Sequence, residues 1–231
     1  PAASRTSRSA LPRRQMAGNP TQDETRSPLL HLHPFPGSNA STLIWNIKIQ
    51  QGWIYTFNPD DPNAHKGIDY IKGDIDQTSS WKAFDIVAAA DGWAMWSNQP
   101  GSTGVYGNFV LIQHQETDFE GKKYLTMYAH MDSVASGIPY QDRTGIDYNT
   151  GNASKWKQVK RGEIVGKTGN TGATNTGIHL HFEVQRDGYA QNKTDPYDLY
   201  KIRDYYPGGS SYVGSGPNRL WTSEPPITGN K

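Results

Sequence analysis

The chain has 231 residues, and its 23 Lys and Arg side chains nearly balance 22 Asp and Glu side chains, for a net charge of +1. This leaves no basic field to hold a nucleic acid or an anionic membrane, so both partners are excluded. There is no cysteine, so disulfides, thiol nucleophiles and Cys-bound zinc are excluded, and any metal ion must be bound by His, Asp or Glu. No apolar run approaches the roughly 18 residues of a membrane helix, so membrane insertion is not expected.

The first 28 residues carry few large apolar side chains and much Arg, Ser and Pro. Such a segment cannot bury enough surface to fold alone, so residues 1–28 are predicted to be a flexible arm or linker. Residues 29–205 are predicted to form one domain. The Gly-, Ser- and Pro-rich residues 206–231 have the composition of a C-terminal tail.

Short apolar or alternating runs, separated mostly by Gly, Asn, Asp or Pro, fill the middle of the chain. They are LIWNIKI, GIDYI, FDIVAAADGWAMW, GNFVLIQH, KYLTMYAH, EIVGKTG and GIHLHFEV. This spacing predicts a mainly β protein without a long amphipathic helix. Short helices are expected at residues 153–159 and 195–203. Residues 132–158 are expected to form a long loop of the kind that often serves as a wall or lid.

The AHKGIDY segment places His65 and Asp69 four residues apart. The two side chains would share a face in a strand or in a helix, but Gly67 and the preceding DPN turn oppose a helix. Two imidazoles and one carboxylate are the ligand set of an open catalytic zinc site. The pair is weak evidence alone, and it gains weight when a second histidine motif lies on a strand.

The TGIHLHFEV run, residues 176–184, supplies that second motif because it alternates strictly. As a strand it would place His179, His181 and Glu183 on one face. Two imidazoles at this spacing lie roughly 7 Å apart at the backbone and can reach one small site. An isolated H-x-H can equally be an exposed pair, and Glu183 can equally orient a ligand histidine or be a surface glutamate. The opposite, buried face would hold Ile178, Leu180, Phe182 and Val184.

The remaining histidines have weaker contexts. His130 ends the apolar run KYLTMYA, either as a polar strand terminus or as a further group that handles protons. His114 is interpreted as structural. The HLH of residues 31–33 is followed by two prolines and lies in no strand pattern, so it is not expected to bind a metal. Residues 162–168 imitate a phosphate-binding loop, but one residue is missing between the glycines.

The ordered set AHKGIDY, DIVAAADGWA, GNFVLIQH, MYAHMDS, VKRGEIVGKTGNTGATNTGIHLHFEV and DPYDLY resembles the lysostaphin-type zinc metalloendopeptidases. These are peptidoglycan hydrolases with an H-x-x-x-D plus H-x-H signature, and the likeness covers roughly residues 34–200. The resemblance implies a compact antiparallel β-sheet with a zinc groove and long surface loops. It would make residues 29–205 a zinc metallopeptidase domain.

The resemblance also implies roles for five residues. His65, Asp69 and His181 would bind one catalytic Zn²⁺, and His130 and His179 would assist catalysis, with the division of acid and base work left open. The protein would hydrolyse peptide bonds in peptidoglycan cross-links or stem peptides through a zinc-activated water. We expect peptidoglycan or another peptide as substrate, a secreted or cell-envelope location, and a monomer.

Two rival functions remain open. One is a non-catalytic relative that binds the cell wall or regulates an amidase; the complete set of five residues counts against it. The other is a zinc peptidase that acts on ordinary proteins. The insert after His130 is long for the family and leaves specificity open. Tyr55 is a candidate aromatic contact to the transition state, but the role is not assigned to it. Five further aromatics could line a groove or, as is commoner in β proteins, pack in the core: Trp53, Trp81, Trp93, Trp96 and Tyr106.

Overall fold

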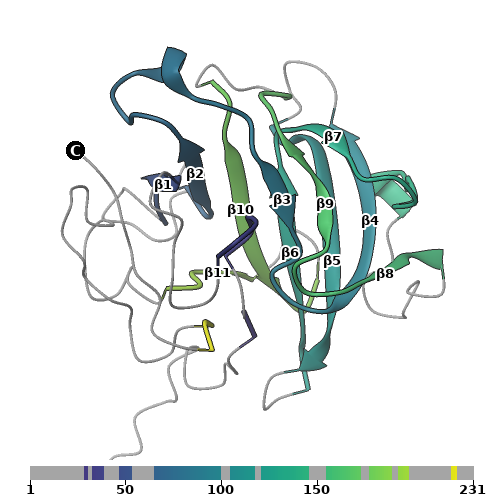
Figure 1. The fold of residues 1–231 in the computed structure, drawn as a ribbon. Coiled ribbons are helices and arrows are strands. Elements are labelled where there is room, and N and C mark those ends of the chain that lie inside the picture. The colour runs from purple at the N-terminus through teal and green to yellow at the C-terminus, as the bar shows by residue number, and fades with distance from the viewer. Residues whose placement is uncertain are drawn as a thin grey trace, which may run out of the picture.

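The computed structural model consists almost entirely of antiparallel strands (Figure 1), which confirms the mainly β prediction. It describes residues 29–30, 33–38, 47–53, 65–99, 105–117, 121–145, 155–172, 177–188, 192–197 and 220–222. Helix in these ranges is limited to short 3₁₀ turns such as η2 (Thr78–Ser80) and η3 (Arg143–Gly145). No helix in the described part of the chain is long and apolar enough to cross a membrane.

The larger sheet has eight strands in the order β1-β2-β10-β6-β5-β4-β8, and β11 pairs with β10. Its neighbouring strands all run antiparallel. The strands are β1 (Ile47–Gln51), β2 (Ile68–Lys72), β4 (Gly92–Gln99), β5 (Gly107–Thr117), β6 (Lys123–Ala129), β8 (Lys157–Val159), β10 (Leu180–Arg186) and β11 (Lys193–Thr194).

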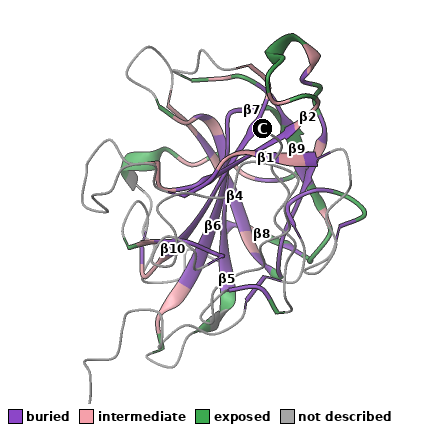
Figure 2. Cartoon of the chain, turned by 90° about the vertical axis from the view of Figure 1, so that its left-hand side faces the viewer, coloured by how far each residue is buried: buried purple, intermediate pink, exposed green. Residues whose placement is uncertain are grey.

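A smaller antiparallel sheet packs on one face of the larger one. It has the order β3-β9-β7, with β3 at Asp85–Val87, β9 at Ile164–Thr168 and β7 at Met131–Val134. Ile86, Met131 and Val165 from this sheet share one buried cluster with Ile112 and Phe182 from the larger sheet. The main core therefore lies between the two sheets, and the strands around it are the buried part of the ribbon in Figure 2.

Strand β10 is buried on both faces. Leu180, Phe182 and Val184 are fully buried on the core side, as predicted, whereas Ile178 is only partly buried because it precedes the strand. Glu183 and Gln185 are also buried, on the opposite face. A second apolar cluster, on β4, β5 and β6 and just before β8, is buried as well: Met95, Phe109, Leu111, Met127, Ala129 and Trp156. Buried polar groups need hydrogen-bond partners, so the polar side chains of β10 must be paired inside the protein.

The central trio β2-β10-β6 joins the segments that carry the candidate residues. His181 in β10 lies opposite Asp69 in β2 and, on its other side, opposite Ala129 in β6. His130 directly follows Ala129, and His65 lies three residues before the first residue of β2. Pairing of three strands that are distant in sequence therefore gathers the predicted site.

Two local predictions differ from the structure. The helix expected at residues 153–159 is wrong for Lys157–Val159, which is strand β8: its residues pair with β4, and this pairing outweighs the local preference. The expected loop 132–158 instead begins in β7 and ends in β8, with residues 146–154 outside the described ranges. Residues 195–197 contain a turn, and the rest of the helix expected at 195–203 lies outside the described residues.

Part of the predicted tail packs into the fold. Leu220 and Trp221 are fully buried, and Trp221 forms a parallel bridge with Leu30. The backbone N–H groups of Leu29 and Leu30 both donate to the Leu220 carbonyl, at 2.7 and 2.8 Å. Two apolar residues in a Gly- and Pro-rich segment are too few for a composition-based signal. The predicted arm, residues 1–28, lies outside the described ranges.

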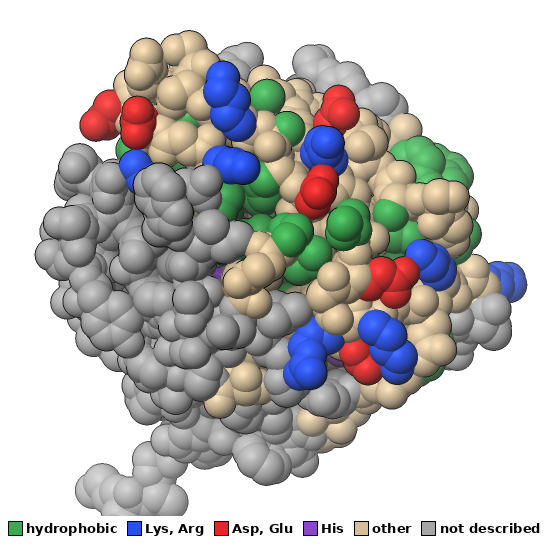
Figure 3. Space-filling view, viewed as in Figure 1, with side chains coloured by type: hydrophobic (Ala, Val, Ile, Leu, Met, Phe, Trp, Pro, Cys, Tyr) green, Lys and Arg blue, Asp and Glu red, His purple; other side chains and the backbone are tan. Residues whose placement is uncertain are grey.

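The structure bears on the expected charge balance of the surface and on the two alternatives for the aromatic residues. On the face seen in Figure 3, Lys and Arg side chains are interspersed with Asp and Glu. Trp53 and Trp81 are buried, so the packing alternative holds for them. Trp96 is partly buried and meets the exposed Tyr140 edge to face, with ring centroids 4.9 Å apart.

Candidate metal centre

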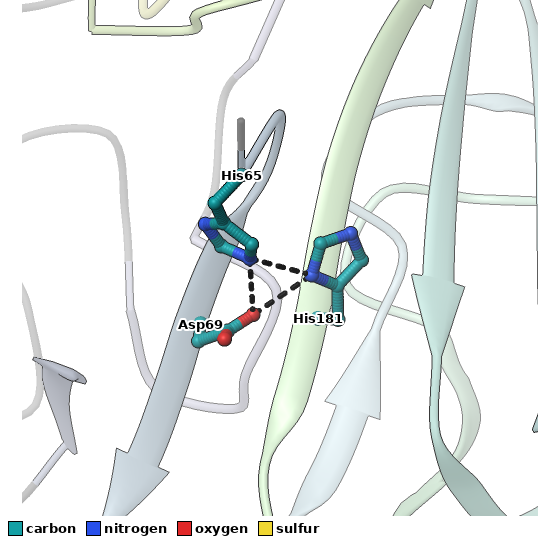
Figure 4. Close-up of side chains that lie close together, drawn as sticks. All are labelled: His65, Asp69 and His181. Carbon is teal, nitrogen blue, oxygen red and sulfur yellow. Dashed lines mark hydrogen bonds and ion pairs between the residues drawn. The ribbon is translucent and has the colours of Figure 1, made fainter. Parts of the chain in front are cut away.

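Three side chains converge on one point (Figure 4): His65 from the segment just before β2, Asp69 from β2 and His181 from β10. His65 Nε2 lies 3.2 Å from Asp69 Oδ1 and 3.1 Å from His181 Nδ1, and His181 Nδ1 lies 2.8 Å from the same carboxylate oxygen. Among the described residues, this is the one group of three or more His, Asp or Glu side chains close enough to share a metal ion. The structure thus brings together all three predicted ligands.

Gly67 makes this convergence sterically feasible. A Cβ atom at this position would lie 2.7 Å from His181 Nε2 and closer still to Cε1 of the same ring. Only a residue without a side chain allows the imidazole to rest so near the strand. In the sequence, Gly67 is recognisable only as a residue that opposes a helix. The real requirement for glycine is therefore a contact across two strands.

The donor set fits a zinc ion. Two imidazole nitrogens and one carboxylate oxygen are the ligands of an open catalytic zinc site. Their separations of 2.8 to 3.2 Å are near the roughly 3.3 Å edge of a tetrahedron with bonds of about 2.0–2.1 Å. All three side chains are mostly shielded from solvent. The geometry is that of three ligands on one side of an ion.

Hydrogen bonds behind the rings decide which nitrogens face the cluster. His65 Nδ1 lies 2.7 Å from the Gly52 carbonyl oxygen, which can only accept, so Nδ1 carries the proton and Nε2 faces the cluster with its lone pair. His181 is oriented the other way: Nε2 lies 2.9 Å from Glu183 Oε1, and Nδ1 faces the cluster. Such outer partners fix the tautomer of a metal-binding histidine.

The charges in the cluster are strongly coupled. Burial opposes ionisation of Asp69, but the charge of His65 and hydrogen bonds from His181 and His65 hold its pKa well below the ordinary value. Burial lowers the pKa of His181, but hydrogen bonds to Asp69 and Glu183 outweigh it and raise this pKa to about 9. The Asp69 carboxylate thus supplies negative charge beside His181 Nδ1, where a metal cation would lie.

His130 and His179 lie beside the cluster. Their ring centroids are 4.6 Å apart, and the His130 ring meets that of His181 at 5.7 Å. His130 Nδ1 donates to the Thr171 carbonyl oxygen and His179 Nδ1 to that of Gly177, both at 2.9 Å. Each ring therefore keeps Nε2 as its acceptor nitrogen. Burial, followed by the charges of His179 and His181, lowers the pKa of His130 to about 4.

The backbone at His130 is unusual. Its φ angle of 63° is left-handed, a conformation that is uncommon for any residue other than glycine. The N–H of His130 donates to the Tyr106 carbonyl oxygen at 3.0 Å. The turn between β6 and β7 therefore places the ring beside His179 instead of continuing the strand. Uncommon backbone of this kind is often found at functional sites.

Glu183 belongs to the same region, and the surface alternative for it is wrong. It is 1% exposed, and its Oε1 accepts from His181, from the Tyr106 hydroxyl at 3.0 Å and from Lys193 Nζ at 2.7 Å. Gln185 Nε2 donates to Oε2 at 2.7 Å. Burial raises the pKa of Glu183, but His181 and then Lys193 lower it to about 2. Gln185 could have been predicted on this face, because it continues the alternation after H-x-H. No local sequence pattern predicts that Lys193 and Tyr106 contact Glu183.

The other histidines lie elsewhere. His114 is fully buried, with Nδ1 2.9 Å from the Asp91 carbonyl oxygen and Nε2 2.9 Å from Thr126 Oγ1, which confirms its structural interpretation. Burial lowers the pKa of His114 to about 4. His33 is buried against Trp221, with ring centroids 4.3 Å apart, and is not part of the cluster. His31 and Tyr55 lie outside the described residues.

Comparison with known proteins identifies the family. Residues 63–193, more than half of the chain, match peptidase family M23. The chain belongs to this family, which confirms the resemblance to the lysostaphin-type peptidases. The matched range contains all five predicted site residues as well as Tyr106, Glu183 and Lys193.

Two curated relatives match parts of the chain. The peptidoglycan DD-endopeptidase ShyA of Vibrio cholerae serotype O1 is 33% identical over 78 residues, which are 34% of this chain and 13% of that protein. The cell division protein DipM of Caulobacter vibrioides is 28% identical over 113 residues, 49% of this chain and 14% of that protein. The chain thus spans about one seventh of the length of these relatives.

Solved structures also resemble the chain. A mutant catalytic domain of the prophage-encoded M23 protein EnpA from Enterococcus faecalis has a TM-score of 0.45 at 20% identity, covering 68% of this chain and 93% of that one. The catalytic domain of the antimicrobial peptidase lysostaphin from Staphylococcus simulans has a TM-score of 0.42 at 18% identity, covering 67% and 91%.

Proposed function

We propose that the chain is a zinc-dependent endopeptidase that hydrolyses peptide bonds in peptidoglycan cross-links or stem peptides. The observation that carries this proposal is the convergence of His65, Asp69 and His181 with the neighbouring rings of His130 and His179, inside the M23 match. The relative named as a peptidoglycan DD-endopeptidase supports the substrate class. Because peptidoglycan lies outside the cytoplasmic membrane, we also propose a secreted or cell-envelope location.

In this proposal His65 Nε2, His181 Nδ1 and Asp69 Oδ1 hold the zinc ion. A zinc ion with three protein ligands lowers the pKa of a water molecule to about 7 and polarises a carbonyl group. Gly67 leaves room for the His181 ring, and Glu183 accepts a hydrogen bond from its Nε2. These three residues would hold the ion, and a water molecule or the substrate would complete its coordination.

His130 and His179 move the proton. Hydrolysis forms a bond from the water oxygen to the carbonyl carbon, breaks the carbon–nitrogen bond, and transfers one proton from the water to the departing amine. The acceptor Nε2 of either ring takes up that proton and then donates it to the amine nitrogen. Before it passes the proton to the amine, the ring that has taken it up can also donate a hydrogen bond from Nε2 to the developing oxyanion.

The first experiment identifies the bond that is cleaved. The protein is incubated with purified peptidoglycan, pentaglycine and casein, with and without a zinc chelator, and new amino termini are identified. We expect new termini from a wall peptide that disappear with the chelator and return with added zinc. Cleavage of casein alone would favour a general protein peptidase. Zinc binding without cleavage of any substrate would favour a wall-binding or regulatory protein.

The second experiment separates ligands from catalytic residues. His65→Ala and Asp69→Asn are expected to lose both zinc and turnover. His130→Ala and His179→Ala are expected to keep zinc and to lose about 10²–10⁴-fold in turnover. Asp187→Asn is the matched control for Asp69→Asn, because Asp187 is a partly exposed aspartate just after β10. The assignment fails if His65→Ala and His179→Ala both retain the metal or both lose it.

A further inference from the structure

His181 differs from the other proposed ligand histidine in what lies behind its ring. His65 is oriented by a backbone carbonyl, whereas His181 is oriented by the buried carboxylate of Glu183. A ring nitrogen that binds a metal must be unprotonated, so a ring that presents Nδ1 must keep its proton on Nε2. The acceptor that faces Nε2 therefore decides whether Nδ1 is available.

Glu183 is held as an acceptor by a second layer of side chains. Lys193 Nζ donates to its Oε1 at 2.7 Å, and the Tyr106 hydroxyl donates to the same oxygen at 3.0 Å. Gln185 Nε2 occupies the other oxygen. A buried carboxylate is costly unless it is paired and hydrogen-bonded, and here both oxygens have donors and the charge has a cation. Strand β11 delivers this cation, because Lys193 lies opposite Gln185 in the β10–β11 ladder.

Tyr106 connects this carboxylate to the second half of the site. Its hydroxyl donates to Glu183 and accepts from Lys193 Nζ at 2.6 Å, while its carbonyl oxygen accepts from the N–H of His130 at 3.0 Å. One residue thus contacts the group that orients a ligand and the backbone of a residue proposed for proton transfer. A displacement of Tyr106 would therefore affect both Glu183 and the backbone of His130.

We propose that Glu183, supported by Lys193 and Tyr106, is a positioning residue that keeps the proton of His181 on Nε2 and so presents Nδ1 to the metal ion. This inference rests on the proposed function for the role of zinc. It goes beyond that function because it assigns Lys193 and Tyr106, neither of which is a proposed ligand, to the metal centre. The three side chains act through His181 and touch no reacting atom.

The test measures zinc binding separately from turnover. Zinc affinity is determined by competition with a chromophoric chelator for Glu183→Gln, Lys193→Met and Tyr106→Phe. Glu183→Gln is expected to weaken zinc binding 10- to 100-fold, the usual effect of removing an outer carboxylate. The other two variants should weaken it by a smaller factor because the carboxylate remains. Lys122→Met is the matched control, since Lys122 pairs with Asp187 at 2.7 Å but both side chains are more than a third exposed.

A spectroscopic measurement distinguishes positioning from general structural damage. In protein labelled with nitrogen-15 at histidine, the two ring nitrogens of zinc-loaded His181 should show a proton on Nε2 and none on Nδ1. Glu183→Gln should disturb this pattern, and Lys122→Met should not. If Glu183→Gln does not fold, Tyr106→Phe decides, because it removes a single hydroxyl. Unchanged zinc affinity and unchanged nitrogen signals in the folded variants would overturn the proposal.

The same measurements keep the two proposals apart. Wild-type protein that binds zinc in the predicted way but cleaves no wall peptide contradicts the proposed substrate and leaves the role of Glu183 standing. Wild-type protein that cleaves peptidoglycan while Glu183→Gln binds zinc equally well contradicts the role of Glu183 alone.

Discussion

Replacing Gly67 with alanine should disturb the metal centre without straining the local backbone. The added Cβ would lie 2.7 Å from His181 Nε2, whereas nonbonded heavy atoms prefer roughly 3.5–4.0 Å. The ring or the strand must therefore move by about 1 Å. The Phe182 carbonyl oxygen also lies 3.1 Å from the same Cβ position, and the pairing of Phe182 with Ile68 opposes a simple separation of β2 from β10. We expect the His181 ring to rotate away from Asp69.

The size of the effect follows from this displacement. A misplacement of about 1 Å at a catalytic site typically costs about 10²-fold in rate, and we expect a loss of that order in peptidoglycan turnover together with weaker zinc binding. Gly67 does not have the left-handed φ that would strain an alanine. Most of the loss should therefore appear in zinc competition and turnover assays.

Gly121→Ala provides the matched control. Gly121 has a φ of 74°, and a Cβ there would meet no heavy atom within 4 Å. This variant should lose about 1 kcal/mol of unfolding free energy from backbone strain and keep zinc affinity and turnover. Wild-type zinc affinity and turnover in Gly67→Ala would refute the close packing of Gly67 against the His181 ring.

Two further predictions concern stability. Trp221→Ala should lower the unfolding free energy in urea by about 3–5 kcal/mol because Trp221 is buried; a loss within about 0.5 kcal/mol would instead support an exposed tail. Burial lowers the pKa of His114 to about 4, so between about pH 4 and pH 6.5 the unfolded chain binds more protons than the folded one, and stability falls as the pH falls. Wild type should therefore lose about 1.4 kcal/mol per pH unit more than His114→Gln in this window, measured by urea unfolding at several pH values, and equal slopes would contradict the buried neutral ring.

Local periodicity was informative wherever one strand face contacts the core. The alternation of residues 176–184 correctly predicted the buried side of β10. His65 and Asp69 do converge, although His65 lies before β2 and not within it. A period of two residues is a property of the strand backbone, so it is visible in one short segment. It does not reveal that the polar face is buried as well.

The mistaken helix at Lys157–Val159 and the unpredicted packing of Trp221 share a physical cause. Lys157–Val159 pairs with β4 across more than 50 residues, and Trp221 pairs with Leu30 across almost the whole chain. Neither contact leaves a local pattern, because the stabilising partner lies far away in sequence. Composition therefore indicated a helix in one place and a tail in the other.

By itself, the sequence determined that the protein is built of short strands, that a metal could be bound only by His, Asp or Glu, and which five residues were candidates for the site. Tertiary structure decided how those residues meet. Antiparallel pairing of β2 with β10 sets Asp69 opposite His181, and β11 brings Lys193 to Glu183. Which ring nitrogen of His181 faces the cluster depends on these distant partners. The reason is that a hydrogen bond across a sheet depends on register and burial, which are properties of the folded chain as a whole.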